Sequence, residues 1–299
     1  MKKLICVLLA MVMMLSLLAG CGNENKPDNN ETTDNAGANA PQTGSSDDYF
    51  VWNGTVIEGL TEEGLKQTSL VIPEKCTELS ILTSEVVQNI TFESDDTILG
   101  FYTFMGCTGL KSITLPGNLT SIQMGVFDGC SSLEEIVIPD SVTMIDYTAF
   151  GNCTSLKHVT LGSGLTLIGS NAFAGCTALE SVSIPDAVAT VDKRAFFGCT
   201  ALQNVTFGAS VETVGESAFE GCVSLAVVDL PEGVKTLDSY AFAFCDALTD
   251  VYLPSSIESM EATALAQTHN FKLHLTQGSY VDQIYGDLMG DEYMEKIYG

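Results

Sequence analysis

The chain has 299 residues, of which 45% are hydrophobic and 17% are charged, so it can fill a sizeable core and is not disordered overall. It carries 12 Lys and Arg against 38 Asp and Glu, a formal net charge of −26. Because this charge repels phosphate backbones and anionic lipid headgroups, the sequence excludes nucleic acid as a partner and membrane attachment through a basic patch.

Residues 1–20 have the pattern of an export signal. A positively charged start precedes an apolar run over residues 4–18, which is too short to span a bilayer comfortably. The run ends in the letters LAGC, which resemble the lipobox of bacterial lipoproteins. This resemblance implies cleavage before Cys21, a lipid group on its thiol, and an exported protein anchored in a membrane. The alternative is an ordinary signal peptide with a chance cysteine beside the cleavage site.

The segment that follows, residues 21–48, is predicted to be a disordered tether that begins at the lipidated Cys21. It contains no aromatic and almost no aliphatic side chain, so it cannot bury enough surface to offset the entropy of ordering. As a flexible chain it has an r.m.s. reach of about 30 Å, which is enough to hold a folded body away from a membrane.

A repeat of 23 residues governs residues 107–267. Each unit has two apolar residues at the alternate spacing of a strand, as in Val159 and Leu161, and a Pro or Gly that ends this strand, as at Pro185. A second apolar pair follows, as in Val188 and Val191, and predicts another short strand. The repeat is marked by seven equally spaced cysteines: Cys107, Cys130, Cys153, Cys176, Cys199, Cys222 and Cys245.

One such unit cannot bury its own apolar face, so stacked units must share a continuous core. The sequence therefore predicts a mainly β solenoid of about seven regular turns, with degenerate turns at its ends. One phenylalanine per unit is expected to form an interior column that ends at Leu265: Phe127, Phe150, Phe173, Phe196, Phe219 and Phe242.

Weaker units flank the repeat. Residues 49–106 are predicted to form an N-terminal cap with degenerate turns, in which Ser84 takes the cysteine position. Residues 268–299 are predicted to form a C-terminal cap, with a last strand at residues 271–275 and a helix in which Val281 begins an apolar stripe. Open solenoid ends need covering, which favours a cap over a partner-binding helix.

The unit C-x-x-L-x-x-[VI]-x-[LIF]-[PG], with a later [AV]-[FL], resembles the treponemal type of leucine-rich repeat in BspA-like bacterial surface proteins. The match is strong over residues 107–267 and extends weakly to about 55–299, where residues 278–287 are similar to the closing segment of such proteins. The resemblance implies a leucine-rich-repeat solenoid and a cell-surface binding protein, with some relatives acting as adhesins. It implies no catalytic residues.

The repeat cysteines are expected to be buried, reduced thiols that fill space in the core. Disulfides are the alternative in an exported protein, but equivalent side chains in stacked parallel turns point the same way. A straight row of sulfurs does not converge on one point, so we expect no metal and no cofactor there. Cys76 has no predictable partner.

Function is expected on the outer face of the strands. The residue between the two inward strand positions points outward and defines a candidate ligand face: Thr114, Val137, Thr160, Ser183, Thr206, Asp229 and Tyr252. Its polar neighbours are Lys111, Glu134, Glu135, Lys157, His158, Glu180, Gln203, Asn204 and Asp250. Two interpretations stay open: a solvated sheet surface, or a shallow binding face with more grip at its C-terminal end.

Catalytic and calcium sites are not expected. The histidines are His158, His269 and His274, and no Ser or Cys motif accompanies them. Three aspartates lie at the same position of the repeat, but only in every second unit. Their carboxylates would therefore lie about 10 Å apart, too far for one calcium ion. They are Asp146, Asp192 and Asp238.

We therefore expect a lipid-anchored cell-surface protein that is not an enzyme and presents its repeat face to a protein or glycan, which belongs to a host or to the envelope. The alternative is a structural or assembly spacer of the bacterial envelope. A solute-binding lipoprotein is disfavoured, because an uninterrupted repeat has no hinged pair of lobes.

Overall fold

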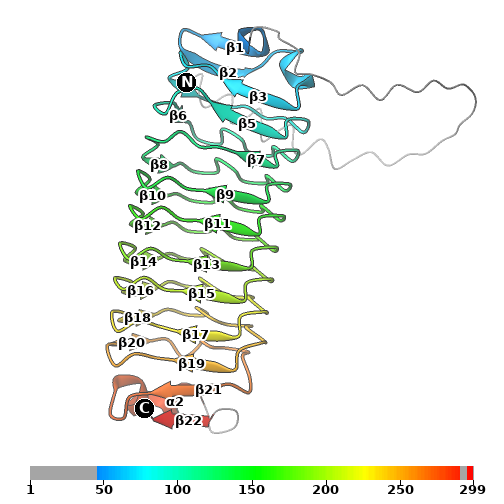
Figure 1. Ribbon diagram of the computed structural model, residues 1–299. Helices are drawn as coiled ribbons and strands as arrows, with labels where there is room; N and C mark the ends of the chain where they lie inside the picture. The colour runs from blue at the N-terminus through cyan, green and yellow to red at the C-terminus, as the bar shows by residue number, and fades with distance from the viewer. Residues whose placement is uncertain (1–45, 290–294, 299) are drawn as a thin grey trace, which may run out of the picture. The chain divides into compact units, whose positions relative to one another are not determined.

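The computed structural model describes residues 46–289 and 295–298. The predicted signal peptide, Cys21 and the tether up to residue 45 lie outside the described residues. The described residues belong to one compact unit, Gly44–Gly299. In Figure 1 the turns of this unit are stacked in chain order, from β1 in blue to β22 in red.

The unit opens with irregular turns. Its elements are η1 (Ser46–Tyr49), β1 (Phe50–Asn53), β2 (Val56–Leu60), η2 (Gly64–Lys66), β3 (Ser69–Ile72), β4 (Glu78–Leu79), β5 (Asn89–Phe92) and β6 (Ile98–Leu99). β1 and β2 pair antiparallel, and β2, β4 and β6 continue that sheet in parallel. The hairpin covers an end of the parallel stack, which would otherwise expose unpaired backbone groups.

Each regular turn contributes two short strands on two sides of the unit. The first series is β7 (Ser112–Ile113), β9 (Glu135–Val137), β11 (His158–Thr160), β13 (Ser181–Ser183), β15 (Asn204–Thr206), β17 (Val227–Asp229) and β19 (Asp250–Tyr252). The second series is β8 (Ser121–Ile122), β10 (Met144–Ile145), β12 (Leu167–Ile168), β14 (Thr190–Val191), β16 (Thr213–Val214), β18 (Thr236–Leu237) and β20 (Ser259–Met260).

The strands of each series pair in parallel at the repeat spacing. The second series forms one sheet in the order β20-β18-β16-β14-β12-β10-β8. The first series forms three shorter sheets, β3-β5-β7, β15-β13-β11-β9 and β17-β19-β21-β22. In both series residues 23 positions apart are partners, as in Val182 with Val205. The predicted mainly β solenoid is confirmed.

The unit ends in β21 (Lys272–Leu275), α2 (Tyr280–Met289) and β22 (Glu295–Tyr298). The helix predicted from the apolar stripe is α2, and Val281 in its first turn is buried. The expected last strand is β21, but β21 is not last, because β22 pairs with its far side in parallel. No helix among the described residues is long and apolar enough to cross a bilayer.

A column of stacked phenylalanine rings fills the core, as predicted. It begins at Phe104, one repeat earlier than the predicted column. Neighbouring ring centroids lie 5.0–5.3 Å apart, and the rings are within 22° of parallel. Leu265 is buried after the last ring. Such offset-stacked pairs add about 0.5–1.5 kcal/mol each beyond the area they bury, so the column favours one fixed register of the turns.

The cysteines of the described chain are free and buried, which confirms the predicted thiols. They also donate hydrogen bonds, which the pattern did not predict. Six of the thiols, from Cys130 to Cys245, donate to a phenylalanine carbonyl 26 residues earlier, at 3.1–3.4 Å. One repeat beyond Cys245, the Thr268 hydroxyl makes the same bond to Phe242, at 3.0 Å. The repeat cysteine position is therefore occupied by a small, buried side chain that donates a hydrogen bond.

Candidate binding surface

We call the outward surface of β7, β9, β11, β13, β15, β17, β19 and β21 the strand face. Side chains alternate along these strands, so the middle residue of β13, Val182, is buried while its two neighbours are exposed. The same alternation exposes each residue of the predicted ligand column: Thr114, Val137, Thr160, Ser183, Thr206, Asp229 and Tyr252. The three sheets of the strand face therefore together present a row of exposed side chains, one from each turn.

The row continues into β21, where the structure adds His274. The register pairs Tyr252 with His274, although the 23-residue spacing would pair it with Leu275. The last regular connection is one residue shorter than the others, and the buried Leu275 faces the core instead. The repeat period therefore gave no indication that His274 lies opposite Tyr252.

Tyr252, His274 and Asp250 form a cluster at the C-terminal end of the strand face, which we call the aromatic cluster. The Tyr252 and His274 rings stack with centroids 3.9 Å apart and an interplanar angle of 14°. The His274 Nε2 atom lies 2.8 Å from Asp250 Oδ1. This hydrogen bond is the main cause that lowers the pKa of the Asp250 carboxyl from its ordinary value. The carboxylate orients the imidazole, and the imidazole supports the tyrosine ring.

Beside the cluster, β17 presents Val227 and Asp229 to solvent. Asp229 is the register partner of Tyr252, and Val227 is the partner of Asp250. Val227 is 43% exposed and Tyr252 is 40% exposed. The Asp229 carboxylate makes no hydrogen bond or ion pair with any residue that the structure describes. This carboxylate is therefore available to a partner.

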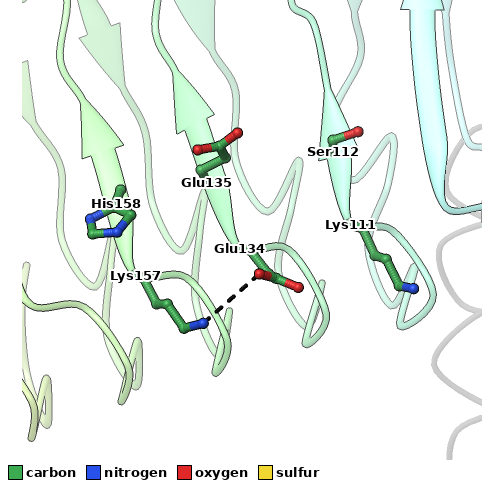
Figure 2. A pocket seen from close by; sticks show the side chains of 6 residues that line it. All are labelled: Lys111, Ser112, Glu134, Glu135, Lys157 and His158. Atoms are coloured by element: carbon green, nitrogen blue, oxygen red, sulfur yellow. Dashed lines mark ion pairs between the residues drawn. The ribbon is translucent and has the colours of Figure 1, made fainter.

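A shallow pocket of about 340 Å³ lies on the strand face nearer its N-terminal end. Figure 2 shows its lining side chains on three successive turns: Lys111, Ser112, Glu134, Glu135, Lys157 and His158. Lys157 Nζ reaches toward Glu134 Oε2 at 3.9 Å, and both side chains are about half exposed. Exposed pairs of this kind contribute about 0–1 kcal/mol. The polar neighbours predicted here thus neutralise one another, as on a solvated sheet surface.

Two of the three carboxylates of the disfavoured calcium site accept hydrogen bonds within the chain. Asp192 accepts a hydrogen bond from Ser170, and Asp146 accepts one from the Tyr147 backbone N–H. Burial, with Glu261 and Glu216 nearby, raises the pKa of Asp238. Within residues 46–289 and 295–298, no group of three or more His, Cys, Asp or Glu side chains could hold a metal ion.

The family comparison matches most of the folded unit. A model described as the BspA type leucine rich repeat region matches residues 80–192 and 166–288, in 6 copies. No curated protein matches the chain.

The chain is also similar to solved structures of leucine-rich repeat proteins. A protein from Bacteroides ovatus is 20% identical over 76% of this chain and 77% of its own, with a TM-score of 0.43. A leucine rich cell surface protein from Faecalibacterium prausnitzii is 20% identical over 85% and 99%, with a TM-score of 0.33. The T. pallidum leucine rich repeat protein is 24% identical over 71% and 83%, with a TM-score of 0.41.

Proposed function

This chain belongs to the BspA-type leucine-rich repeat family, and from that premise we propose that it is a lipid-anchored cell-surface protein that binds a protein or glycan through its strand face. One observation carries the proposal. The exposed row along the parallel strands changes from small side chains, Thr160 to Thr206, to Asp229, Tyr252 and His274 at one end. A uniform solvated sheet does not need this change.

The side chains at that end have properties that suit binding. Aromatic rings bury a large area on contact and lose little conformational entropy, and the stack with His274 already holds the Tyr252 ring in place. The proposal includes no catalytic step, because binding by repeat proteins uses an extended surface.

The alternative is a structural or assembly spacer of the envelope. The paired Lys157 and Glu134 near the N-terminal end favour it, because they leave that part of the face electrically balanced. The two functions differ in whether a saturable partner exists beyond the cell's own wall.

Binding is tested with the exported full-length protein, purified in nonionic detergent and applied to host matrix proteins, glycans and wall fragments. The strand-face variant Thr160→Lys, Ser183→Lys, Thr206→Lys is compared with Thr143→Lys, Thr166→Lys, Ala189→Lys. This control adds the same charge at exposed positions directly before three strands of the second series. The proposal expects a saturable partner that the first variant loses and the second keeps. Binding of wall fragments alone, equally by both variants, supports the spacer.

Anchoring is tested separately by metabolic labelling with a radioactive fatty acid. The proposed lipid group on Cys21 predicts label in the wild-type chain and none in Cys21→Ala, which should then leave the membrane fraction. Equal label in both chains, or membrane retention of the unlabelled variant, contradicts lipid anchoring at Cys21 without bearing on the strand face.

A further inference from the structure

One face of the Tyr252 ring is uncovered and is directed toward Asp229. His274 on β21 covers the other ring face at 3.9 Å, and the two rings are almost parallel. Since β17, β19 and β21 lie side by side in that order, the uncovered face of Tyr252 is turned toward β17. There the register partner of Tyr252 is Asp229, whose side chain is too short to cover an aromatic ring. The 40% exposure of Tyr252 agrees with an open ring face.

The space over Asp229 fits one planar group. Neighbouring strands are about 4.8 Å apart, so a flat group stacked on Tyr252 would stand above the Asp229 carboxylate. The Asp229 carboxylate has no partner within the described part of the chain, and the adjacent Asp250 is already engaged by His274. A single unpaired negative charge therefore lies beside a single open aromatic face.

A guanidinium group matches both features. It is planar, stacks on aromatic rings, stays charged, and donates to a carboxylate from a fixed fork of N–H groups. Val227, also exposed on β17, offers apolar surface for the aliphatic stem of an arginine. The net charge of −26 attracts a cationic partner at long range. Lysine fits less well, because its ammonium group cannot stack as a plane.

We propose that Tyr252 and Asp229 form a binding site for an arginine side chain on a protein partner. The proposal rests on the proposed function and names its partner chemistry. The site occurs once, because the same column holds neither an aromatic residue nor an acid in the five preceding turns: Thr114, Val137, Thr160, Ser183 and Thr206. The Asp250–His274 pair positions the Tyr252 ring without contacting the arginine.

The test titrates the exported full-length protein with a capped peptide, Gly-Arg-Gly-Arg-Gly, and follows binding by calorimetry. Two matched peptides replace arginine by lysine or by citrulline, which keeps the planar shape and removes the charge. We expect saturable binding of the arginine peptide, several-fold weaker binding of the lysine peptide, and no binding of the citrulline peptide. Equal binding of the arginine and lysine peptides overturns the proposal.

Two variants test the aromatic ring and the carboxylate separately, and both leave the buried residues of the repeat core unchanged. Tyr252→Leu and Asp229→Asn should each weaken the arginine peptide about tenfold. The control Asp246→Asn removes the same charge from an exposed residue outside the strands. Equal weakening by Asp246→Asn shows nonspecific attraction and overturns the proposal. Circular dichroism on each variant checks that the fold is kept, and Asp229→Asn, which loses no internal contact, decides the question if Tyr252→Leu unfolds.

The proposal can fail while the proposed function stands. If a neutral glycan binds the strand face and loses affinity in Tyr252→Leu while the arginine peptide does not bind, the arginine site is wrong and the binding protein remains. If neither peptide nor any array component binds saturably, both proposals are overturned.

Discussion

At the residue scale, the repeat cysteine combines two properties in one small side chain. It fills space beside the phenylalanine column and donates to a carbonyl of the preceding turn, at 3.1 Å for Cys176. Thr268 makes the same bond with a hydroxyl. Ser84 is buried at the other end of the column, where its hydroxyl accepts hydrogen bonds from the backbone N–H groups of Val86 and Val87. The position therefore tolerates either chemistry, provided that the side chain is small and can donate.

This dual role predicts an order of stability for substitutions at Cys176. Cys176→Ser keeps the donor and nearly keeps the volume, whereas Cys176→Ala loses both. We expect Cys176→Ala to lower the free energy of unfolding by about 1–2 kcal/mol and Cys176→Ser to lower it less. Urea unfolding followed by circular dichroism measures both. A larger loss for serine than for alanine would show that the bond to Phe150 contributes nothing.

Burial of the thiols also makes stability depend on alkaline pH. Desolvation raises the pKa of Cys107 and of Cys245 to about 12, above the 9.0 of an exposed thiol. Above pH 9 the unfolded chain loses these protons while the folded chain keeps them, so the unfolded state binds fewer protons and stability falls as pH rises. Between pH 9 and 12, each of these two thiols lowers the free energy of unfolding by about 1.4 kcal/mol for every pH unit of increase.

Thermal unfolding of the wild type and of Cys107→Ser, Cys245→Ser at pH 8, 9, 10 and 11 measures this dependence. The serine variant should lose stability less steeply above pH 9, and the two chains should run parallel below it. Identical slopes above pH 9 would mean that the two thiols ionise as readily in the folded chain as in the unfolded one.

At the element scale, each turn of the solenoid bends through a corner with a left-handed backbone residue. One such column is Tyr102, Gly125, Thr148, Asn171, Arg194, Ser217 and Tyr240. Thr148 is the β-branched member, with a φ of 49°. This conformation costs an L-residue about 1–2 kcal/mol, while glycine adopts it freely, as Gly125 does one turn earlier.

Thr148→Gly should therefore raise the free energy of unfolding by about 1 kcal/mol, the relief of strain being partly offset by the greater freedom of the unfolded chain. Thr148→Ala removes the same methyl and hydroxyl groups but keeps a Cβ at positive φ, so it should gain less. Urea unfolding of the two variants compares them directly. A less stable glycine variant would show that the Thr148 side chain contributes more through its contacts than its backbone costs.

The 23-residue period predicts much of the strand pairing and of the core. One period determines the partners of the regular strands and the phenylalanine column, because a stacked turn repeats its contacts with its neighbours. Alternation along each strand likewise predicts which residues face outward, including Asp229 and Tyr252.

The period does not predict the structure after the last regular turn, where the spacing between strands changes. The connection into β21 is one residue short, which brings His274 rather than Leu275 opposite Tyr252. β22 is a four-residue strand after a helix, too short to show a period of its own. The stacked ring pair depends on this local change of register, so the spacing could predict the face but not its aromatic cluster.

At the scale of the whole molecule, the folded unit is a one-dimensional stack in which each turn is stabilised by its two neighbours. A defect in the middle therefore weakens two interfaces at once. The rings on either side of Phe173 lie 5.0 Å and 5.2 Å from it, and all three are fully buried.

Phe173→Ala should lower the free energy of unfolding by about 3–5 kcal/mol, because it removes buried area and leaves a cavity between two rings. Phe173→Leu should cost less, since it fills much of that space, as Leu265 does at the end of the column. Hydrogen exchange should show faster opening of the turns beside residue 173 in the alanine variant. Unchanged protection there would contradict stabilisation by neighbouring turns.

The proposed function requires that the partner binds the strand face and not the sheet of the second series. We would place a photo-crosslinking amino acid at Thr206 on the strand face or at Thr166, directly before β12 of the second series. Cells that display the protein would be irradiated with and without added host matrix proteins or glycoproteins. Binding through the strand face predicts a crosslinked product from position 206 that saturates with the partner and is missing from position 166. Equal products from both positions, or products with the cell's own wall alone, would contradict it.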